Sequence, residues 1–207
     1  MTAVDHNPMP SIPGQVTAAR ATGKSFYQRW QERWDEIATL MGRDVPVEME
    51  QVQWLIGTWS TGIAAYATPT RPERSSEYPD ARFRWLSAFG GHWLLFQGEY
   101  RPGNLFMFSY VRYLAYDPCS RQWVKMTIEH PAGWSVMTAP GWTGNQLTFE
   151  GTAQILGELV ELRHRLVKLS QDAWKWENDE MQADGSWLPI DEHRCSRLVE
   201  HDTVHNA

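Results

Sequence analysis

The feature that most constrains the fold of this chain is its regular alternation of apolar runs and turns. From Trp59 onward, short runs rich in β-branched and aromatic residues alternate with turn signals at intervals of about ten residues. The turn signals include Gly-Gly, Pro-Gly, Asp-Pro, Gly-Asn and Asp-Gly pairs. The pair Asp184-Gly185 is a strong hairpin signal. This spacing is typical of an all-β barrel or sandwich.

The apolar runs predict about ten strands. They cover residues 58–67, 82–88, 92–100, 106–117, 121–129, 133–139, 145–153, 158–169, 173–182 and 187–199. Periodicity fits 158–169 to a helix or a strand almost equally well, and we assign a strand because the segment lies among hairpins. An open sheet of this size would expose its edges, whereas closure removes them. We therefore expect a mainly β fold, an up-and-down antiparallel barrel with a central cavity.

An N-terminal α-helical extension is expected over residues 23–44, ahead of a barrel over 45–200. Its apolar side chains recur at helical spacing, as Phe26, Trp30, Trp34, Ile37 and Met41. The barrel or a second copy of the chain must cover this aromatic face, so a homodimer through the helix is one expectation. A shorter helical turn is expected to start at Pro46. We expect a flexible tail at 1–22 and a second tail at 201–207.

Composition and charge narrow the classes of function. The 12 Trp residues argue against extended disorder because their rings must pack. No apolar run approaches about 18 residues, and Asp+Glu (25) outnumber Lys+Arg (19), so we expect no membrane or nucleic-acid partner. The excess acid lies within residues 171–207 and is most simply a solvated rim. Two cysteines are too few for a disulfide framework, and without a signal-peptide pattern we expect a cytoplasmic protein.

An ordered set of short sequences carries a resemblance to a known family. The set comprises Trp54-Leu55-Ile56-Gly57-Thr58-Trp59, Gly90-Gly91-His92-Trp93-Leu94, Leu114-Ala115-Tyr116-Asp117, Lys125, the Leu-Thr-Phe-Glu-Gly run at 147–151, and Asp184-Gly185-Ser186-Trp187. Followed by a terminal strand that contains arginine, this order resembles the bacterial lipocalin-like domains of unknown function in the calycin superfamily, over roughly 50–200.

The resemblance implies a small antiparallel barrel in which Trp59 closes one end. A cationic side chain of the last strand, Arg197 or alternatively Arg194, would lie over the Trp59 ring in a structural role. Haem-binding barrel relatives also begin with G-x-W, but usually continue with a Tyr-Pro pair, whereas Tyr66 here is followed by Ala. We therefore expect no cofactor and keep haem as the alternative.

Candidate catalytic residues must be sought among polar side chains on the strands, because the chain has no G-x-S-x-G, P-loop, H-E-x-x-H or C-x-x-C pattern. Glu129 and His130 are an adjacent acid and base, although neighbours in a strand point to opposite faces. His164 shares a face with apolar residues and could enter the lumen. We expect no metal; His92 is the candidate ligand, without a second ligand at a matching spacing.

Large apolar groups on both faces of the central strands indicate a cover on one face and a ligand cavity on the other. The candidate ligand-binding residues are Trp93, Phe96, Tyr110, Trp123, Trp134, Arg163 and Arg165. The simplest register places Arg163 and Arg165 on the solvated outer face. In the inverted register they would form a carboxylate-binding pair inside the barrel.

Three functions follow from these candidates. The first is a lipocalin-like barrel that binds a small, mostly hydrophobic or aromatic ligand in its lumen. The second is a cofactor-independent barrel enzyme, an isomerase, cyclase or hydrolase, acting on a hydrophobic metabolite. The third is a haem-binding barrel or an oligomerising interaction module. The fold alone does not rank them, so whether the chain is an enzyme stays open.

Overall fold

The computed structural model describes residues 25–34, 39, 44–66, 78–100, 108–130 and 133–198. The chain divides into two units, Met1–Asp44 and Val45–Ala207. The tails expected at its two ends lie outside the described residues.

The first unit contains helix α2, which spans Phe26–Glu32. Ser25 caps its start, since the backbone N–H of Gln28 donates to the Ser25 hydroxyl at 3.2 Å. The helix covers seven residues of the extension expected over 23–44, and Trp34 and Thr39 are also helical. Residues 35–38 and 40–43 of that extension lie outside the described residues, and the homodimer through it stays a prediction.

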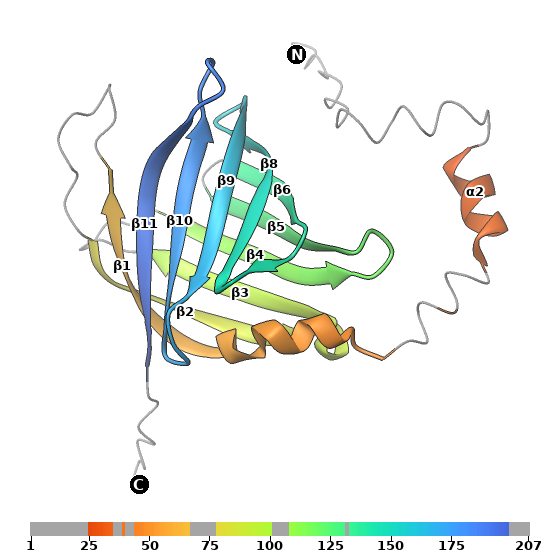
Figure 1. Cartoon of the computed structure of the whole chain (residues 1–207), viewed down its shortest axis with the longest axis horizontal. Helices are drawn as coiled ribbons and strands as arrows, with labels where there is room; N and C mark the ends of the chain where they lie inside the picture. The colour runs from red at the N-terminus through yellow and green to blue at the C-terminus, as the bar shows by residue number, and fades with distance from the viewer. Residues whose placement is uncertain are drawn as a thin grey trace, which may run out of the picture. The chain divides into compact units, whose positions relative to one another are not determined.

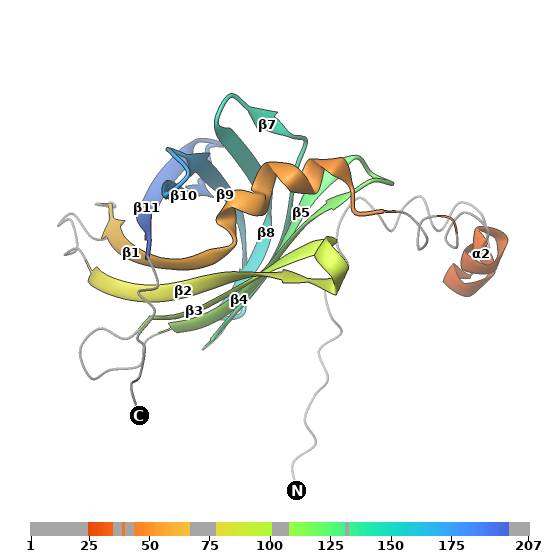
Figure 2. The ribbon, with the colours of Figure 1, turned by 90° about the horizontal axis from the view of Figure 1, so that it is seen from below.

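Ten strands of the second unit form one closed antiparallel barrel (Figures 1 and 2). They are β1 (Gly57–Ala65), β2 (Tyr78–Ala88), β3 (Trp93–Tyr100), β4 (Phe108–Asp117), β5 (Gln122–His130), β6 (Gly133–Ala139), β8 (Gln146–Ile155), β9 (Glu158–Lys168), β10 (Ala173–Met181) and β11 (Trp187–Arg197). A two-residue strand, β7 (Trp142–Thr143), pairs with β8. The ring closes because β1 pairs with β11 and β6 pairs with β8 past β7.

The expected fold class, a mainly β up-and-down antiparallel barrel of about ten strands, is confirmed. The segment that periodicity left between helix and strand is the strand β9. The Asp184-Gly185 hairpin joins β10 to β11, with Gly185 at a φ of +83°. The Asp184 carboxylate accepts the backbone N–H of Ser186 at 2.9 Å, which holds the turn.

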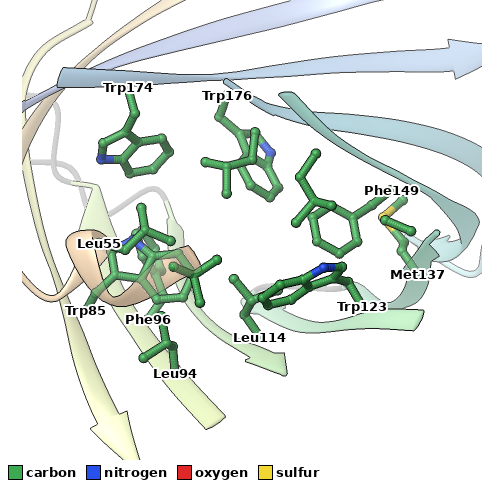
Figure 3. Close-up of a cluster of buried hydrophobic side chains, with 14 of the residues drawn as sticks. Leu55, Trp85, Leu94, Phe96, Leu114, Trp123, Met137, Phe149, Trp174 and Trp176 are labelled. Carbon is green, nitrogen blue, oxygen red and sulfur yellow. The ribbon is translucent and has the colours of Figure 1, made fainter. Parts of the chain in front are cut away.

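Alternation of side chains along each strand separates the lumen from the outer face. In β6, for example, Ser135, Met137 and Ala139 are buried in the lumen, whereas Trp134 and Val136 are exposed. Figure 3 shows the same rule on β10, where Trp174 and Trp176 point into the interior toward rings from other strands. Burial on one face with a period of two is the pattern that a closed barrel requires.

A short 3-10 helix, η1 (Val47–Leu55), closes one end of the barrel, as the turn expected at Pro46. Figure 1 shows it lying across the end at which β1 begins and β11 ends. Trp59 is fully buried above this helix, and its indole N–H donates to the Leu55 carbonyl at 2.7 Å. The Arg197 guanidinium lies over the Trp59 ring at 4.2 Å and donates to the Ile56 carbonyl at 2.9 Å.

Apolar side chains fill the lumen next to η1 (Figure 3). The fully buried members are Leu55, Trp59, Trp85, Leu94, Leu114, Trp123, Leu147, Leu166 and Trp174. Trp59 meets Trp174 edge to face with ring centroids 5.9 Å apart. We call these fully buried side chains the apolar layer; they pack the end of the lumen that η1 closes. In the described residues, no helix is long and apolar enough to cross a membrane.

Candidate ligand-binding site

Three basic side chains lie buried in the lumen beyond the apolar layer. Arg112 on β4 is 5% exposed, Lys125 on β5 is 1% exposed and His164 on β9 is 6% exposed. Each stands two positions from a buried apolar residue of its own strand, as an inward-facing residue must. We name these three side chains the basic cluster. Buried basic groups are uncommon because removing a charge from water is costly.

Lys125 and His164 meet across the lumen. The Lys125 amine and Nδ1 of His164 share a hydrogen bond, although β6 and β8 separate their strands in the ring. The same amine lies 4.7 Å from the centre of the Trp176 ring and 5.7 Å from that of Phe149. The lysine therefore ends between aromatic faces, which attract a cation but do not neutralise it.

Arg112 is held mainly by aromatic rings. Its guanidinium carbon lies 4.6 Å from the centre of the Tyr110 ring and 5.0 Å from that of Trp176. Tyr110 in turn stacks on Phe96, with centroids 5.1 Å apart. The nearest carboxylate is Glu129 at 3.8 Å, and 40% of that side chain is exposed. A buried arginine, which stays charged in proteins, is therefore paired with a carboxylate at long distance only.

Burial changes the protonation of the other two basic groups. Burial lowers the pKa of Lys125 well below its ordinary value, and the nearby Arg112 charge lowers it further while Glu129 opposes the change. Burial, with Lys125, Arg112 and His193, likewise lowers the pKa of His164. Both groups are thus driven toward their neutral forms, first by burial and then by the neighbouring positive charges.

Four buried polar atoms near the basic cluster have no hydrogen-bond partner among the described residues: Arg112 Nε, Thr127 Oγ1, Trp176 Nε1 and Asn178 Oδ1. Arg112 and Thr127 stand directly opposite each other on β4 and β5. Trp176 and Asn178 are two positions apart on β10 and share its inner face. Each unpartnered buried polar group costs about 1–3 kcal/mol, so four in one place need an explanation. The other buried atoms without a hydrogen-bond partner are the indole nitrogens of Trp85, Trp142 and Trp174, and Arg165 Nε, which lies 2.8 Å from the Glu177 carboxylate on the outer face.

The structure corrects the inverted register for Arg163 and Arg165. Both lie on the outer face of the barrel, where Asp179 accepts Arg163 Nε and Arg165 Nη2, each at 2.9 Å. Arg165 also pairs with Glu177 at 2.8 Å, and Arg163 lies over the Trp187 ring at 4.4 Å. These arginines are held by carboxylates outside the barrel and form no carboxylate-binding pair in the lumen.

The expected lumen aromatics divide between the two faces. Phe96, Tyr110 and Trp123 face inward, and Phe96 and Trp123 are fully buried. Trp93 lies on the outer face of β3 against Tyr113, with centroids 6.3 Å apart, so its assignment to the lumen is wrong. Trp134 is also on the outer face, 40% exposed, and its indole N–H donates to Gln154 at 2.5 Å. The assignment of Trp134 to the lumen is therefore wrong as well.

The candidate catalytic residues do not form one group. His164 enters the lumen and contacts Lys125, whereas Glu129 pairs with Arg112. His130 ends β5, and its side chain lies outside the described part of the chain. His92 lies half-buried between the short helix η2 (Phe89–Gly91) and β3. Within the described ranges, no three or more His, Cys, Asp or Glu side chains gather as a metal site would require.

Sequence reasoning missed Arg112 and the lumen position of Lys125. The available signal was the parity of Lys125 with Trp123, because residues two apart in a strand share a face. That signal is weak here, since Met126 and Ile128 on the opposite face are apolar too, and Ile128 is 59% exposed. A hydrophobicity pattern therefore favours the wrong face of β5.

A pocket of about 770 Å³ is lined from both faces of the barrel wall and includes Tyr110 and Glu129, which contact Arg112. Five of its lining residues stand opposite one another across β1–β5, namely Thr58, Arg84, Gln97, Val111 and Ile128. All five alternate with buried residues and so belong to the outer face. Its other lining residues include Phe83, Gly98, Tyr110 and Glu129, which belong to the inner face.

The fold and this interior define a closed up-and-down β-barrel whose lumen combines aromatic rings with buried bases. The crystal structure of Rv2717c from M. tuberculosis has a similar fold, with a TM-score of 0.54 at 14% identity over 75% of this chain and 100% of that chain. Two redesigned beta barrels also align, b11L5F_LGL (TM-score 0.33, 12% identity, 72% of this chain and 95% of that one) and mFAP1 bound to DFHBI (0.29, 13%, 70% and 97%). No protein-family model matches the chain. No curated protein matches it either. The Rv2717c similarity and the closed ring fit a lipocalin-like fold.

Proposed function

We propose that this barrel belongs to the lipocalin-like domains and binds a small, mostly apolar or aromatic molecule in its lumen. The observation that carries the proposal is the set of four unpartnered polar atoms around the basic cluster. An interior that served only stability would be filled with apolar side chains, because unpartnered polar groups and buried charges both weaken a core. A ligand that supplies the missing partners would remove this cost.

The aromatic surroundings support a flat or apolar body for the ligand. The rings of Phe96, Tyr110, Phe149 and Trp176 stand around the basic cluster and contact its cations. Rings of this kind give a ligand large apolar contact, and the few polar atoms among them fix its orientation. Small barrels commonly hold one small molecule at this position.

Calorimetric titration tests the proposal with two pairs of probes: 2-naphthoate and 2-naphthamide, and decanoate and decanamide. We expect at least one probe to bind saturably and one to one, with a Kd below about 1 mM. That Kd corresponds to a binding free energy of roughly −4 kcal/mol. Thr127→Phe places a ring in the lumen and should abolish this binding. The matched control Thr152→Phe lies on the exposed outer face of β8 and should leave it unchanged. If no probe binds, or if both variants bind like the wild type, the proposal is wrong.

The other functions expected from the sequence remain predictions. An enzyme built on His164 or Glu129, haem binding, and a homodimer through the N-terminal helix each require their own assay. The cytoplasmic location expected from the sequence also stays a prediction. Visible absorbance of the purified protein is the direct test for haem.

A further inference from the structure

We propose that the molecule bound in the lumen carries a carboxylate, and that Arg112 and Lys125 together hold this group. The inference rests on the proposed function, because it names the chemistry of the ligand at the same site. Three independent observations carry it: the balance of charge in the lumen, the kind of polar atoms left unpartnered, and the placement of both cations on one ring.

The balance of charge favours an anion. Arg112, Lys125, His164 and His193 face the lumen, and the carboxylates on the same face are Glu129, at 3.8 Å from Arg112, and Asp191, at 3.3 Å from His193. Asp179, which is also buried, serves Arg163 and Arg165 on the outer face. The lumen therefore contains more basic groups than acids, and a bound carboxylate would correct the difference.

The unpartnered atoms favour an acceptor. Arg112 Nε and Trp176 Nε1 are donors only, and the Thr127 hydroxyl can donate. With the Lys125 amine, this makes four donors that a carboxylate could accept through the four lone pairs of its two oxygens. The Asn178 carbonyl oxygen is the remaining unpartnered atom, because the Asn178 amide already donates to Asp191 at 2.5 Å. It would accept a hydroxyl or amine of the same ligand.

The two cations share one wall. Arg112 lies 5.0 Å from the centre of the Trp176 ring, and Lys125 lies 4.7 Å from it. The two residues come from the neighbouring strands β4 and β5. Trp176 projects from β10 across the lumen and so sets a common distance for both (Figure 3). A carboxylate between the two cations would lie against this ring, with the apolar body of the ligand continuing toward Tyr110 and Phe96.

Binding of an anion at this point should also draw a proton into the site. The charged and titratable groups of the lumen around Lys125 are Arg112 and Tyr110 from β4, Glu129 from β5, His164 from β9, and His193 and Asp191 from β11. A carboxylate beside Lys125 favours the ammonium form and raises the pKa that burial had lowered, so binding should be accompanied by proton uptake. The proton comes from the buffer and is visible in the heat of binding.

The experiment compares 2-naphthoate with its neutral isostere 2-naphthamide, in full-length wild-type protein and in variants. A charged hydrogen bond contributes about 1.5–3 kcal/mol, which predicts a preference of about tenfold or more for the naphthoate. Lys125→Met and Arg112→Met should each reduce that preference to about twofold or less. Lys175→Met removes the same charge from the outer face of β10 and should keep the preference. Titrations in phosphate and in Tris should show proton uptake for the wild type and a loss of it in Lys125→Met.

The outcomes separate this inference from the function on which it rests. If neither naphthalene probe nor either ten-carbon probe binds, the proposed function itself fails. If naphthamide binds as tightly as naphthoate, the barrel binds small molecules but the carboxylate is not recognised. If Lys175→Met lowers the preference as much as Lys125→Met does, the effect is one of overall charge, and the assignment to the lumen is wrong. Should Arg112→Met fail to fold, Lys125→Met decides, because methionine preserves the packing of the lysine stem.

Discussion

Replacing Lys125 with methionine should make the empty barrel more stable, in contrast to most substitutions of fully buried residues. Lys125 is 1% exposed and pairs with no carboxylate in the described structure. Exchanging buried charged groups for apolar ones of similar volume is often neutral or stabilises a protein by about 1–4 kcal/mol. Methionine keeps the contact of the side-chain stem with Trp176 and Phe149.

The gain in stability is reduced because the substitution leaves His164 without its hydrogen-bond partner. His164 Nδ1 loses the hydrogen bond with Lys125, which costs about 1 kcal/mol. We therefore expect a net gain of about 2 kcal/mol in the free energy of unfolding near neutral pH. In a domain of this size each kcal/mol raises the Tm by about 2–4 °C, so the Tm should rise by about 4–8 °C.

The pH dependence of the gain gives a sharper test than its size. Because the pKa of Lys125 is lowered in the folded state, the unfolded chain binds one more proton between the folded pKa and the ordinary value of 10.5. Within that window the wild type gains up to about 1.4 kcal/mol of stability for each unit of rising pH. Above 10.5 the penalty is absent, and as the pH falls through the folded pKa it becomes complete. The advantage of Lys125→Met should therefore shrink as the pH rises toward 10.5.

Guanidinium chloride unfolding at pH 7.5 and 9.5 measures this advantage directly. Lys175→Met, which carries the same substitution on the outer face, should show no such narrowing. A Lys125→Met protein that is less stable than the wild type at pH 7.5 would refute the reasoning. An advantage that is the same at both pH values would refute the claim that burial lowers the pKa of Lys125 in the folded barrel.

Three further predictions follow from other parts of the barrel. Cys195 is buried and burial raises its pKa to about 12, whereas Cys119 is exposed. A thiol reagent at pH 8 should therefore modify one cysteine per folded chain and two after denaturation. Rapid modification of both cysteines in the folded chain would contradict the burial of Cys195. Arg197→Met removes the bonds to the carbonyls of Trp54 and Ile56, and should lower the free energy of unfolding by about 2–4 kcal/mol. Arg194→Met, on an exposed side chain, should cost less than about 1 kcal/mol in the same denaturant titration, and equal losses would disprove a special role for Arg197. Gly151→Ala should cost about 1–3 kcal/mol by thermal unfolding, because the new Cβ would lie 2.6 Å from the Val136 carbonyl oxygen, while Gly62→Ala has open space and should cost far less.

The strands of this barrel could be predicted from local sequence because turns punctuate them. The expected run at 133–139 coincides with β6, and most other runs differ from the observed strands by one to three residues at an end. The segment 158–169 was ambiguous by periodicity, because its leucines fit both spacings. Its place in the meander decided the matter, since β9 hydrogen-bonds to both β8 and β10.

Which face of each strand points inward was harder to predict. On β9 the basic residues Arg163 and Arg165 alternate with buried apolar residues, so the simplest register was right. On β3 both faces are apolar, with Trp93 and Leu95 on one and Leu94 and Phe96 on the other. The hydrophobic pattern therefore does not indicate which face points inward. The lumen of β5 holds a lysine because of contacts with other strands, and such contacts leave no periodic trace in the sequence.

The pairing of β1 with β11 has a consequence for how the chain is made. Ser60 and Ser196 meet in this pair although 136 positions separate them, and Arg197 completes the closed end over Trp59. A growing chain therefore exposes the free edges of β1 and of its latest strand until β11 has emerged from the ribosome and paired with β1. Contacts between such distant residues slow folding, and exposed edges invite pairing with other chains. The period before the last strand emerges is the one in which this protein would most benefit from a chaperone.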